Sequence, residues 1–336
     1  PTTSTYMTGV PQQASNVSIY PVADPANDIV KLNPDSAYQP LATILEAMKM
    51  EQKKAAGLVV TCEFPHATPA DCSSHHYSRS KYQFLAPQMA ANNLEVMFGG
   101  GNDFITDAMK SHLKSTGTAL FQDNKNAMMN FTGEKVWALF DKQAMPYDLD
   151  RNPDLIPSIS EMTSKAIEIL NKNPNGFFLM VEGSKVDWAA HANDPAGMIG
   201  EFLAFDKAVG AALDFAKKDG NTTVIILPDH GNSGFSIGRN GLKKSYTSLT
   251  LEDLFGTVSK ITRTAEGLEK IMLNTKPEEI KNVFRQYTGI DITDQEMKTL
   301  AGSRNYKAED YTSVSNSKNM THNTTVSIND RLHIGY

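Results

Sequence analysis

Residues 177–230 read FFLMVEGSKVDWAAHANDPAGMIGEFLAFDKAVGAALDFAKKDGNTTVIILPDH, and this stretch decides the fold. The apolar run 177–181 follows Asn-Gly and predicts a strand that is buried on both faces. From Pro195 to Gly220, apolar residues repeat at helical spacing, which predicts a helix. The apolar run 222–227 predicts a second strand. Because two strands joined by one helix form a βαβ unit, we expect them to be parallel.

Metal-ligand side chains follow both predicted strands. They are three carboxylates and two imidazoles: Glu182, Asp187, His191, Asp229 and His230. Open α/β sheets hold their sites at the carboxyl ends of parallel strands, so these side chains are predicted to meet there. Carboxylates with neutral imidazoles suit zinc, whereas an all-oxygen subset suits magnesium. The alternative is that the acidic residues at these strand ends are ordinary solvated loop residues.

Composition and charge limit the classes of function. The 336 residues are 40% apolar and 21% charged, with a net charge of −6, which are ordinary values for a globular protein. This charge does not indicate a nucleic-acid reader, and no apolar run approaches the roughly 20 residues of a membrane span. Cys62 and Cys72 are too few for a disulfide scaffold, and they are either paired or two free thiols.

Further apolar runs and periodic segments predict the rest of an α/β core. After one such run, Gly99-Gly100-Gly101 predicts a tight turn rather than a phosphate-cradling loop, because no Gly-Lys-Ser/Thr follows. His75 and His76 are expected on a helix, as packing or hydrogen-bonding residues. The other predicted strands are 58–62, 94–98 and 136–140, and the other predicted helices are 40–54, 103–114 and 159–171.

The sequence divides into three expected segments. Residues 1–247 are expected to form most of an α/β core. Helical spacing in 249–273 and 277–287 predicts that residues 248–319 form a small helical insertion that caps one side of the site. Residues 320–336 are expected to return to the core.

Several motifs resemble those of the alkaline phosphatase family in their order and spacing. They are FFLMVEGSKVDWAAH (177–191), TVIILPDH (223–230), HATPADCSSHHYSRSKY (66–82), FGGGNDFI (98–105) and STYMTGV (4–10). The resemblance runs from near Pro1 to about Ile237 and resumes weakly at 329–336. It implies a three-layer α/β sandwich with a mostly parallel central sheet and helices on both faces.

The resemblance also implies a role for each site residue, with two zinc ions and one magnesium ion as cofactors. Arg79 falls at the family's substrate arginine, and a planar guanidinium gives two parallel hydrogen bonds to phosphate oxygens. His66 would contact a metal-bound water or bind the third metal, and Trp188 would form a wall of the pocket. The implied ligands are Asp187 and His191 for one zinc, Asp229 and His230 for the other, and Thr68 and Glu182 for magnesium.

Compared with the family, the chain is expected to be truncated at both ends. The nucleophilic serine of the family would lie just before the equivalent of Pro1. A third histidine ligand of the first zinc would lie beyond Tyr336. The resemblance therefore implies that residues 1–336 alone are catalytically inactive.

The implied function is that of an alkaline phosphatase, a metal-dependent phosphomonoester hydrolase that acts through a phosphoserine intermediate. Small-molecule phosphomonoesters are the implied substrates. The alternatives are a phosphodiesterase or a sulfatase on the same scaffold, or a catalytically incomplete metal-binding fragment. Family habit implies a periplasmic or secreted enzyme, although no signal peptide is visible. Relatives are commonly homodimers and some are monomers, so a homodimer is one of two expected states.

Overall fold

The computed structural model describes residues 1–238, 244–305, 318–332 and 334–335. The chain forms two compact units, and each is described by itself. The units do not follow the three segments expected from the sequence, 1–247, 248–319 and 320–336, whose limits stay a prediction. Unit 1 comprises Pro1–Pro146, Asn152–Gly183 and Phe205–His230, and unit 2 comprises Tyr147–Arg151, Ser184–Ala204 and Gly231–Tyr336.

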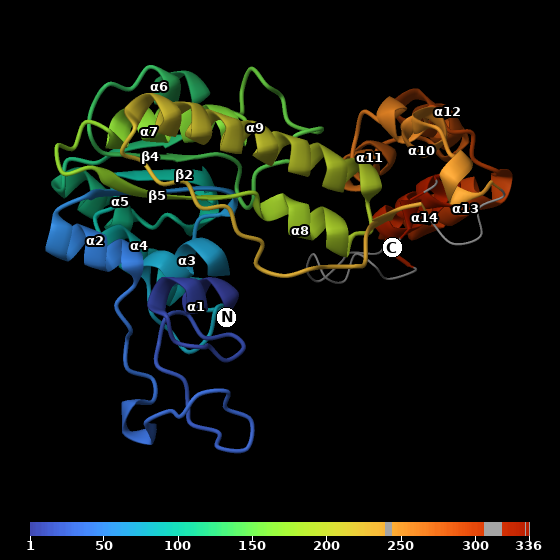
Figure 1. Cartoon of the computed structure of the whole chain (residues 1–336). Helices are drawn as coiled ribbons and strands as arrows, with labels where there is room; N and C mark the ends of the chain where they lie inside the picture. The colour runs from blue at the N-terminus through green and yellow to red at the C-terminus, as the bar shows by residue number, and fades with distance from the viewer. Residues whose placement is uncertain (239–243, 306–317, 333, 336) are drawn as a thin grey trace. The chain divides into compact units, whose positions relative to one another are not determined.

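A parallel sheet of five strands forms the centre of unit 1 (Figure 1). The strand order is β3-β4-β2-β1-β5, and each of these pairings is parallel. The inner strands β1, β2 and β4 are buried along their whole length, as their apolar runs predict. The strands are β1 (Ala55–Glu63), β2 (Val96–Gly100), β3 (Ala119–Gln122), β4 (Val136–Leu139) and β5 (Phe177–Glu182).

Helices cover both faces of this sheet (Figure 1). One face carries α7 (Ile159–Leu170) and the part of α9 (Pro195–Asp219) that belongs to unit 1. The other face carries α2 (Ile44–Gln52) and α4 (Tyr82–Ala91). The expected three-layer fold with a mostly parallel sheet is thus confirmed. No helix in the described part of the chain combines the length and apolarity needed to cross a membrane. The remaining α-helices of unit 1 are α1 (Thr2–Thr8), α3 (Ala67–Ser73), α5 (Asp107–Ser115) and α6 (Lys125–Met129).

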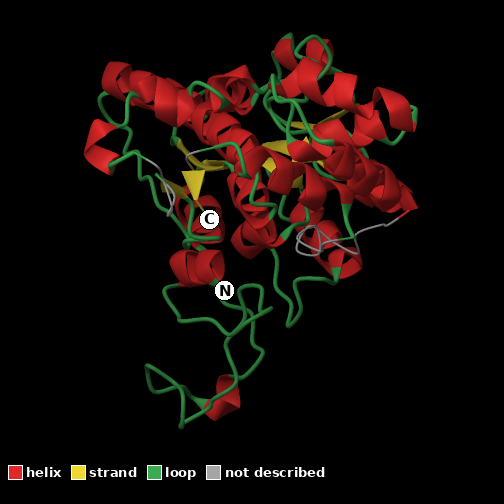
Figure 2. Ribbon diagram, turned by 90° about the vertical axis from the view of Figure 1, so that its right-hand side faces the viewer, coloured by secondary structure: helices red, strands yellow, loops and turns green. Residues whose placement is uncertain are grey.

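The segment between α1 and α2 is mostly loop, with one short 3-10 helix at Pro34–Ser36 (Figure 2). An antiparallel bridge joins Val17 to His76, in the turn that follows α3. The backbone N–H of Arg79 donates to the carbonyl of Ser15 at 2.8 Å. This loop therefore fixes the backbone that carries Arg79.

The predicted strand at residues 222–227 is wrong. No strand is present in this segment, and Ile225, Ile226 and Leu227 are 74%, 55% and 59% exposed. A strand persists only when its backbone groups pair with a neighbour. In the described residues, β5 pairs only with β1, and residues 222–227 pair with no strand of the sheet. The second half of the expected βαβ unit is therefore missing from the sheet.

Smaller differences also separate the structure from the sequence prediction, among them the unpredicted helices α4 and α6. The edge strand β3 was not predicted, because its residues are half-exposed and carry little alternation. The segment after β5 forms the helix α8 (Ser184–His191), which lies outside the predicted helices. His75 and His76 lie in the loop after α3 rather than on a helix.

The glycines at the end of β2, Gly99 and Gly100, and the following Gly101 allow a close backbone contact. A Cβ atom on Gly100 would lie 2.3 Å from the carbonyl oxygen of Gln143, so a side chain does not fit there. Gly101 has φ +109°, a conformation that favours glycine. The predicted turn at these glycines is thus present, and the chain also approaches the backbone of Gln143 closely there.

Unit 2 has its own helical core. α11 (Ala265–Met272) packs against α14 (Met320–Asn329), and Leu268, Met272 and Ile328 are buried between the helices of this unit. A two-stranded antiparallel ladder joins β6 (Ser236–Ile237) to β7 (Ile334–Gly335). Unit 2 also contains α8, the first part of α9, and the helices α10 (Leu251–Phe255), α12 (Ile280–Thr288) and α13 (Asp294–Gly302).

An ion pair between Glu46 and His75 makes the stability of unit 1 depend on pH. His75 Nε2 lies 3.0 Å from Glu46 Oε1. Burial alone would raise the pKa of Glu46, but hydrogen bonds from His75 and the Thr43 backbone lower it below 4.5. Burial alone would lower the pKa of His75, but Glu46 and the Ser18 carbonyl raise it above 6.5. The carboxylate stabilises the fold above pH 4.5 and the imidazolium below pH 6.5, so the pair contributes most between these values.

We therefore expect His75→Gln to lower the free energy of unfolding by about 0.5–1.5 kcal/mol near pH 5.5. The difference should shrink as the pH rises through the raised pKa of His75. Urea unfolding at a series of pH values measures it. His76→Gln is the control, since the His76 ring contacts Ser78 instead. An equal loss at all pH values would contradict the ion-pair origin.

Candidate functional site

Two neighbouring strands bring Cys62 and Glu182 together in unit 1. Val60 of β1 is in register with Glu182, the last residue of β5, and Cys62 lies two residues further along β1. Cys62 Sγ lies 3.4 Å from Glu182 Oε2 and is placed to donate a hydrogen bond to it. Cys62 is fully buried and Glu182 is partly buried. The carboxyl ends of two parallel strands thus hold a thiol against a carboxylate.

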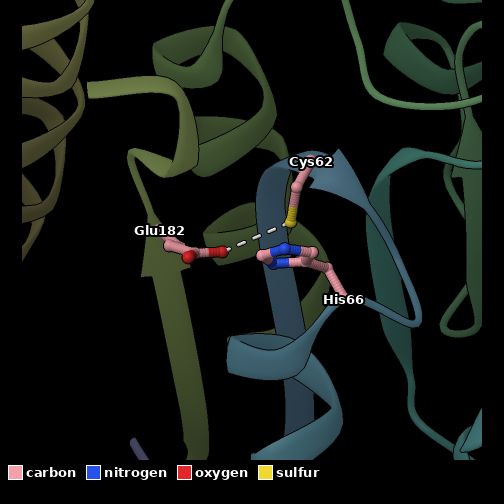
Figure 3. Close-up of side chains that lie close together, drawn as sticks. All are labelled: Cys62, His66 and Glu182. Atoms are coloured by element: carbon pink, nitrogen blue, oxygen red, sulfur yellow. Dashed lines mark hydrogen bonds between the residues drawn. The ribbon is translucent and has the colours of Figure 1, made fainter. Parts of the chain in front are cut away.

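His66 completes a group of three ligand-type side chains. It follows the turn after β1, where its backbone N–H donates to the Glu63 carbonyl, and it precedes the first residue of α3. One ligand atom from each of Cys62, His66 and Glu182 lies within 4.8 Å of the other two (Figure 3). The structure therefore brings the predicted residues His66 and Glu182 to one place.

Arg79 contacts the same group through His66. Arg79 Nη2 donates to His66 Nε2 at 3.1 Å. Burial, followed by the charge of Arg79, lowers the pKa of His66 to about 3. The imidazole is consequently neutral near pH 7, which is the form that binds metal ions.

Thr68 lies in the first turn of α3, two residues after His66. Its carbonyl oxygen accepts a hydrogen bond from Cys72 Sγ at 3.4 Å. Cys62 and Cys72 are both buried and form no disulfide with each other. The role of Thr68 as a magnesium ligand stays a prediction.

Asp229 and His230 form an adjacent pair in unit 1. His230 Nε2 lies 3.1 Å from Asp229 Oδ2, and each side chain is about half exposed, at 51% and 50%. The Tyr6 hydroxyl donates to the carbonyl of Pro228 at 2.9 Å, which attaches this segment to α1. In the described part of the chain, this pair does not join the group formed by Cys62, His66 and Glu182.

Asp187 and His191 form a second pair, in unit 2. They lie one turn apart on α8, with His191 Nε2 3.6 Å from Asp187 Oδ2. Asn232 Nδ2 donates to Asp187 Oδ1 at 2.8 Å and orients that carboxylate. Trp188 is partly buried beside them, and its role as a pocket wall stays a prediction. Because the two acid–histidine pairs belong to different units, their convergence on one pocket also stays a prediction.

The sequence pattern does not predict the contacts of Cys62 or Lys185. Cys62 stands at the end of a predicted strand and four residues before His66, a spacing that can indicate a metal ligand. Lys185 is 3% exposed, and its Nζ lies 3.9 Å from the centre of the Tyr147 ring. Burial lowers the pKa of Lys185, and the charges of Glu266 and Glu201 oppose that shift. Lys185 therefore anchors α8 to the interior of unit 2.

These features define a class: an α/β protein with metal-ligand side chains at the carboxyl ends of a parallel sheet. A model of the family described as alkaline phosphatase matches residues 2–264. The chain belongs to the alkaline phosphatase family.

Individual relatives agree with this assignment. Alkaline phosphatase 3 of Bacillus subtilis is 41% identical over 209 residues, which cover 60% of this chain and 45% of that protein. Alkaline phosphatase 4 of the same organism is 35% identical over 266 residues, covering 77% and 55%. The chain thus spans about half the length of these curated relatives. The crystal structure of a cold-active alkaline phosphatase from Shewanella sp. superposes with a TM-score of 0.81 at 23% identity, covering 100% of this chain and 75% of that one.

Proposed function

We propose that the whole protein is a metal-dependent phosphomonoester hydrolase, an alkaline phosphatase, which acts through a phosphoserine outside residues 1–336. Membership of the family supports this proposal. The observation that carries it within the chain is the contact between Arg79 and His66 beside Glu182. A guanidinium next to ligand-type side chains suits a phosphate group that bridges an arginine and a metal ion.

The acid–histidine pairs fit zinc. A carboxylate and a neutral imidazole are ordinary zinc ligands, and Asp187 with His191 lies at a spacing of 3.6 Å and Asp229 with His230 at 3.1 Å. We propose that each pair holds one zinc ion. When bound, these ions would supply Lewis-acid stabilisation of the entering and leaving oxygens.

The chain's own residues orient the substrate in this proposal. Arg79 binds two equatorial phosphate oxygens and neutralises charge that grows in the transition state. The Ser15 carbonyl holds the Arg79 backbone in place. Asn232 fixes the rotamer of Asp187, which keeps that ligand aimed in one direction.

We propose that Glu182 and Thr68 offer oxygen ligands to a magnesium ion, as the family resemblance implies. Cys62 and His66 also lie beside the Glu182 carboxylate, with one ligand atom of each within 4.8 Å of the others. No step of the reaction is assigned to this ion.

Phosphate release from several phosphomonoesters tests the proposed function. For the whole protein we expect turnover on structurally different monoesters at alkaline pH. Chelation should lower kcat by about 10³-fold or more, because bound metals supply several kcal/mol of transition-state stabilisation. Zinc should restore the activity. Equal rates before and after chelation would contradict the metal-dependent mechanism.

Residues 1–336 expressed alone serve as the matched comparison. We expect this polypeptide to release no phosphate from the same monoesters. Strong hydrolysis by it would contradict the placement of the nucleophilic serine outside these residues. A phosphodiester and a sulfate ester in the same assay test the two other hydrolase classes.

We further propose a periplasmic or secreted location and a homodimer for the whole protein. Family membership supports both. Cell fractionation tests the location, and analytical ultracentrifugation of the whole protein tests the dimer.

A further inference from the structure

The turn that follows α8 in unit 2 is fixed by hydrogen bonds that meet at Asp194. α8 ends in a Schellman motif: Asn193 has φ +53°, and the backbone N–H of Asp194 donates to the Ala189 carbonyl at 2.9 Å. His191 is the last residue of α8. Because a helix lacks internal partners for its last carbonyl groups, the backbone that carries His191 depends on this turn.

The Asp194 carboxylate accepts hydrogen bonds from the N-termini of two helices. Its Oδ1 accepts from the backbone N–H of Gly197 at 3.0 Å, as the N-cap of α9. Its Oδ2 accepts from the backbone N–H of Ala265, the first residue of α11, at 2.7 Å. A Cβ atom on Gly197 would lie 3.0 Å from Asp194 Oδ2, so the glycine leaves room for the carboxylate. One buried side chain therefore joins the turn after α8 to both α9 and α11.

The Asp194 side chain has two acceptor oxygens at the pH of the proposed reaction. Burial raises the pKa of Asp194 to about 6, and hydrogen bonds from the backbones of Gly197 and Ala265 oppose this rise. The group is ionised at alkaline pH, where each oxygen can accept from one of the two N–H groups. An asparagine has the same shape but one acceptor oxygen, so it cannot serve both helices.

The proposed zinc ligands Asp187 and His191 lie on the helix that this turn ends. His191 Nε2 is 3.6 Å from Asp187 Oδ2, and Asn232 orients the carboxylate. The position of the imidazole depends on the last turn of α8. Since metal ligands must be held within about 0.5 Å of their productive geometry, that turn has to be fixed by its surroundings.

We infer that Asp194 is a positioning residue for the zinc pair: by joining the end of α8 to α11, it holds the imidazole of His191 at its distance from the Asp187 carboxylate. This role rests on the proposed function, because it takes the pair as zinc ligands. It gives α11 a part in building the metal site. The competing account is that Asp194 only stabilises the helix ends that it caps.

Zinc affinity of the whole protein separates the two accounts. The metal-free protein is titrated with Zn²⁺ against a chromogenic chelator, and His191→Ala identifies the zinc ion that the pair holds. We expect Asp194→Asn to weaken binding of that ion by about 10–100-fold, the usual effect of losing an outer partner of a metal ligand. Binding of other zinc ions should stay unchanged. In a His191→Ala background, Asp194→Asn should have no further effect on zinc binding.

Asp150 offers the matched control at the same end of α11. Asp150 Oδ1 accepts from the backbone N–H of Thr264, the N-cap of α11, at 3.0 Å. In the described part of the chain, the printed hydrogen bonds of Asp150 go to Thr264 and to the Tyr147 carbonyl, and none reaches the turn after α8. Asp150→Asn should therefore leave zinc affinity unchanged, even where urea unfolding shows a loss of stability similar to that of Asp194→Asn. Equal weakening of zinc binding by both variants would favour the capping account and overturn the positioning role.

Asn329→Ala loosens the same turn with less risk to the fold. Asn329 lies on α14 and is partly buried, and its Nδ2 donates to the Asn193 carbonyl at 3.0 Å. We expect binding of the same zinc ion to weaken by about fivefold, the effect of one ordinary hydrogen bond. A folded Asp194→Asn protein with unchanged zinc affinity would overturn the positioning role. If Asp194→Asn does not fold, unchanged affinity in Asn329→Ala would overturn it instead.

The same titrations distinguish this role from the proposed function. If His191→Ala leaves all zinc binding unchanged, the zinc assignment of the proposed function fails, and the positioning role fails with it. If His191→Ala removes one zinc ion and Asp194→Asn does not weaken its binding, only the positioning role fails. Zinc affinity is measured without substrate, so neither result depends on turnover.

Discussion

Arg79→Ala should lower kcat/KM of the whole protein for phosphomonoesters by about 10²–10³-fold, the usual effect of removing one charge-stabilising donor. The side chain lies beside His66 and Glu182, and Arg79 Nη2 is 3.1 Å from His66 Nε2. An alanine there leaves the equatorial phosphate oxygens without their planar partner. Steady-state kinetics with a chromogenic monoester measure the change.

Two further variants separate geometry from charge at this position. Arg79→Lys should recover only part of the loss, because an ammonium cannot make two parallel hydrogen bonds. Lys81→Ala removes a cation two residues away and should leave kcat/KM nearly unchanged. If Arg79→Ala behaved like Lys81→Ala, the proposed phosphate site would be misplaced.

Trp137→Ala should lower the free energy of unfolding by about 3–5 kcal/mol. Trp137 lies in β4 and is fully buried, and its ring packs edge-on against Phe64 with centroids 5.4 Å apart. The substitution leaves a large cavity between the sheet and its neighbours. Urea unfolding of residues 1–336, followed by far-ultraviolet circular dichroism, gives the difference.

Leu155→Ala is the matched control for this loss. Leu155 also belongs to unit 1 but is 63% exposed, so its truncation should change stability by no more than about 0.5 kcal/mol. A similar small change for Trp137→Ala would show that β4 does not pack as described.

The central strands could be predicted because they are buried on both faces. The runs that form β1, β2 and β4 are apolar and buried along their whole length. The run 177–181 also predicts a strand correctly, but its burial on both faces is wrong, because β5 is only partly buried and lies at the end of the strand order in the described residues. Helices that pack on the sheet show a helical period in their apolar residues. The turn could also be predicted from a short stretch of sequence, the three consecutive glycines 99–101. These features depend on short stretches of sequence, and they agree with the structure within a few residues.

Pairing partners could not be predicted in the same way. Residues 222–227 have the composition of a buried strand, but composition does not state which neighbour supplies the hydrogen bonds. The edge strand β3 forms without a strong apolar pattern, because it is half-exposed and has a neighbouring strand on one side only. In both cases tertiary context decided the outcome.

The candidate site also combines residues that the sequence predicts with one whose position depends on tertiary structure. The resemblance to the family's motifs predicts His66, Arg79 and Glu182 as site residues. The position of Cys62 depends on the register of β1 against β5, which joins residues about 120 positions apart. Only the register of the sheet places the Cys62 thiol against the Glu182 carboxylate.

The uncovered run TTVIIL at residues 222–227 affects how the protein behaves in concentrated solution. It carries no charge and no proline and is rich in β-branched residues, a composition that favours stacking into cross-β aggregates. Asp219 and Asp229 flank it and act as gatekeepers that repel an approaching copy. The self-association of residues 1–336 is therefore expected to depend on these two flanking carboxylates.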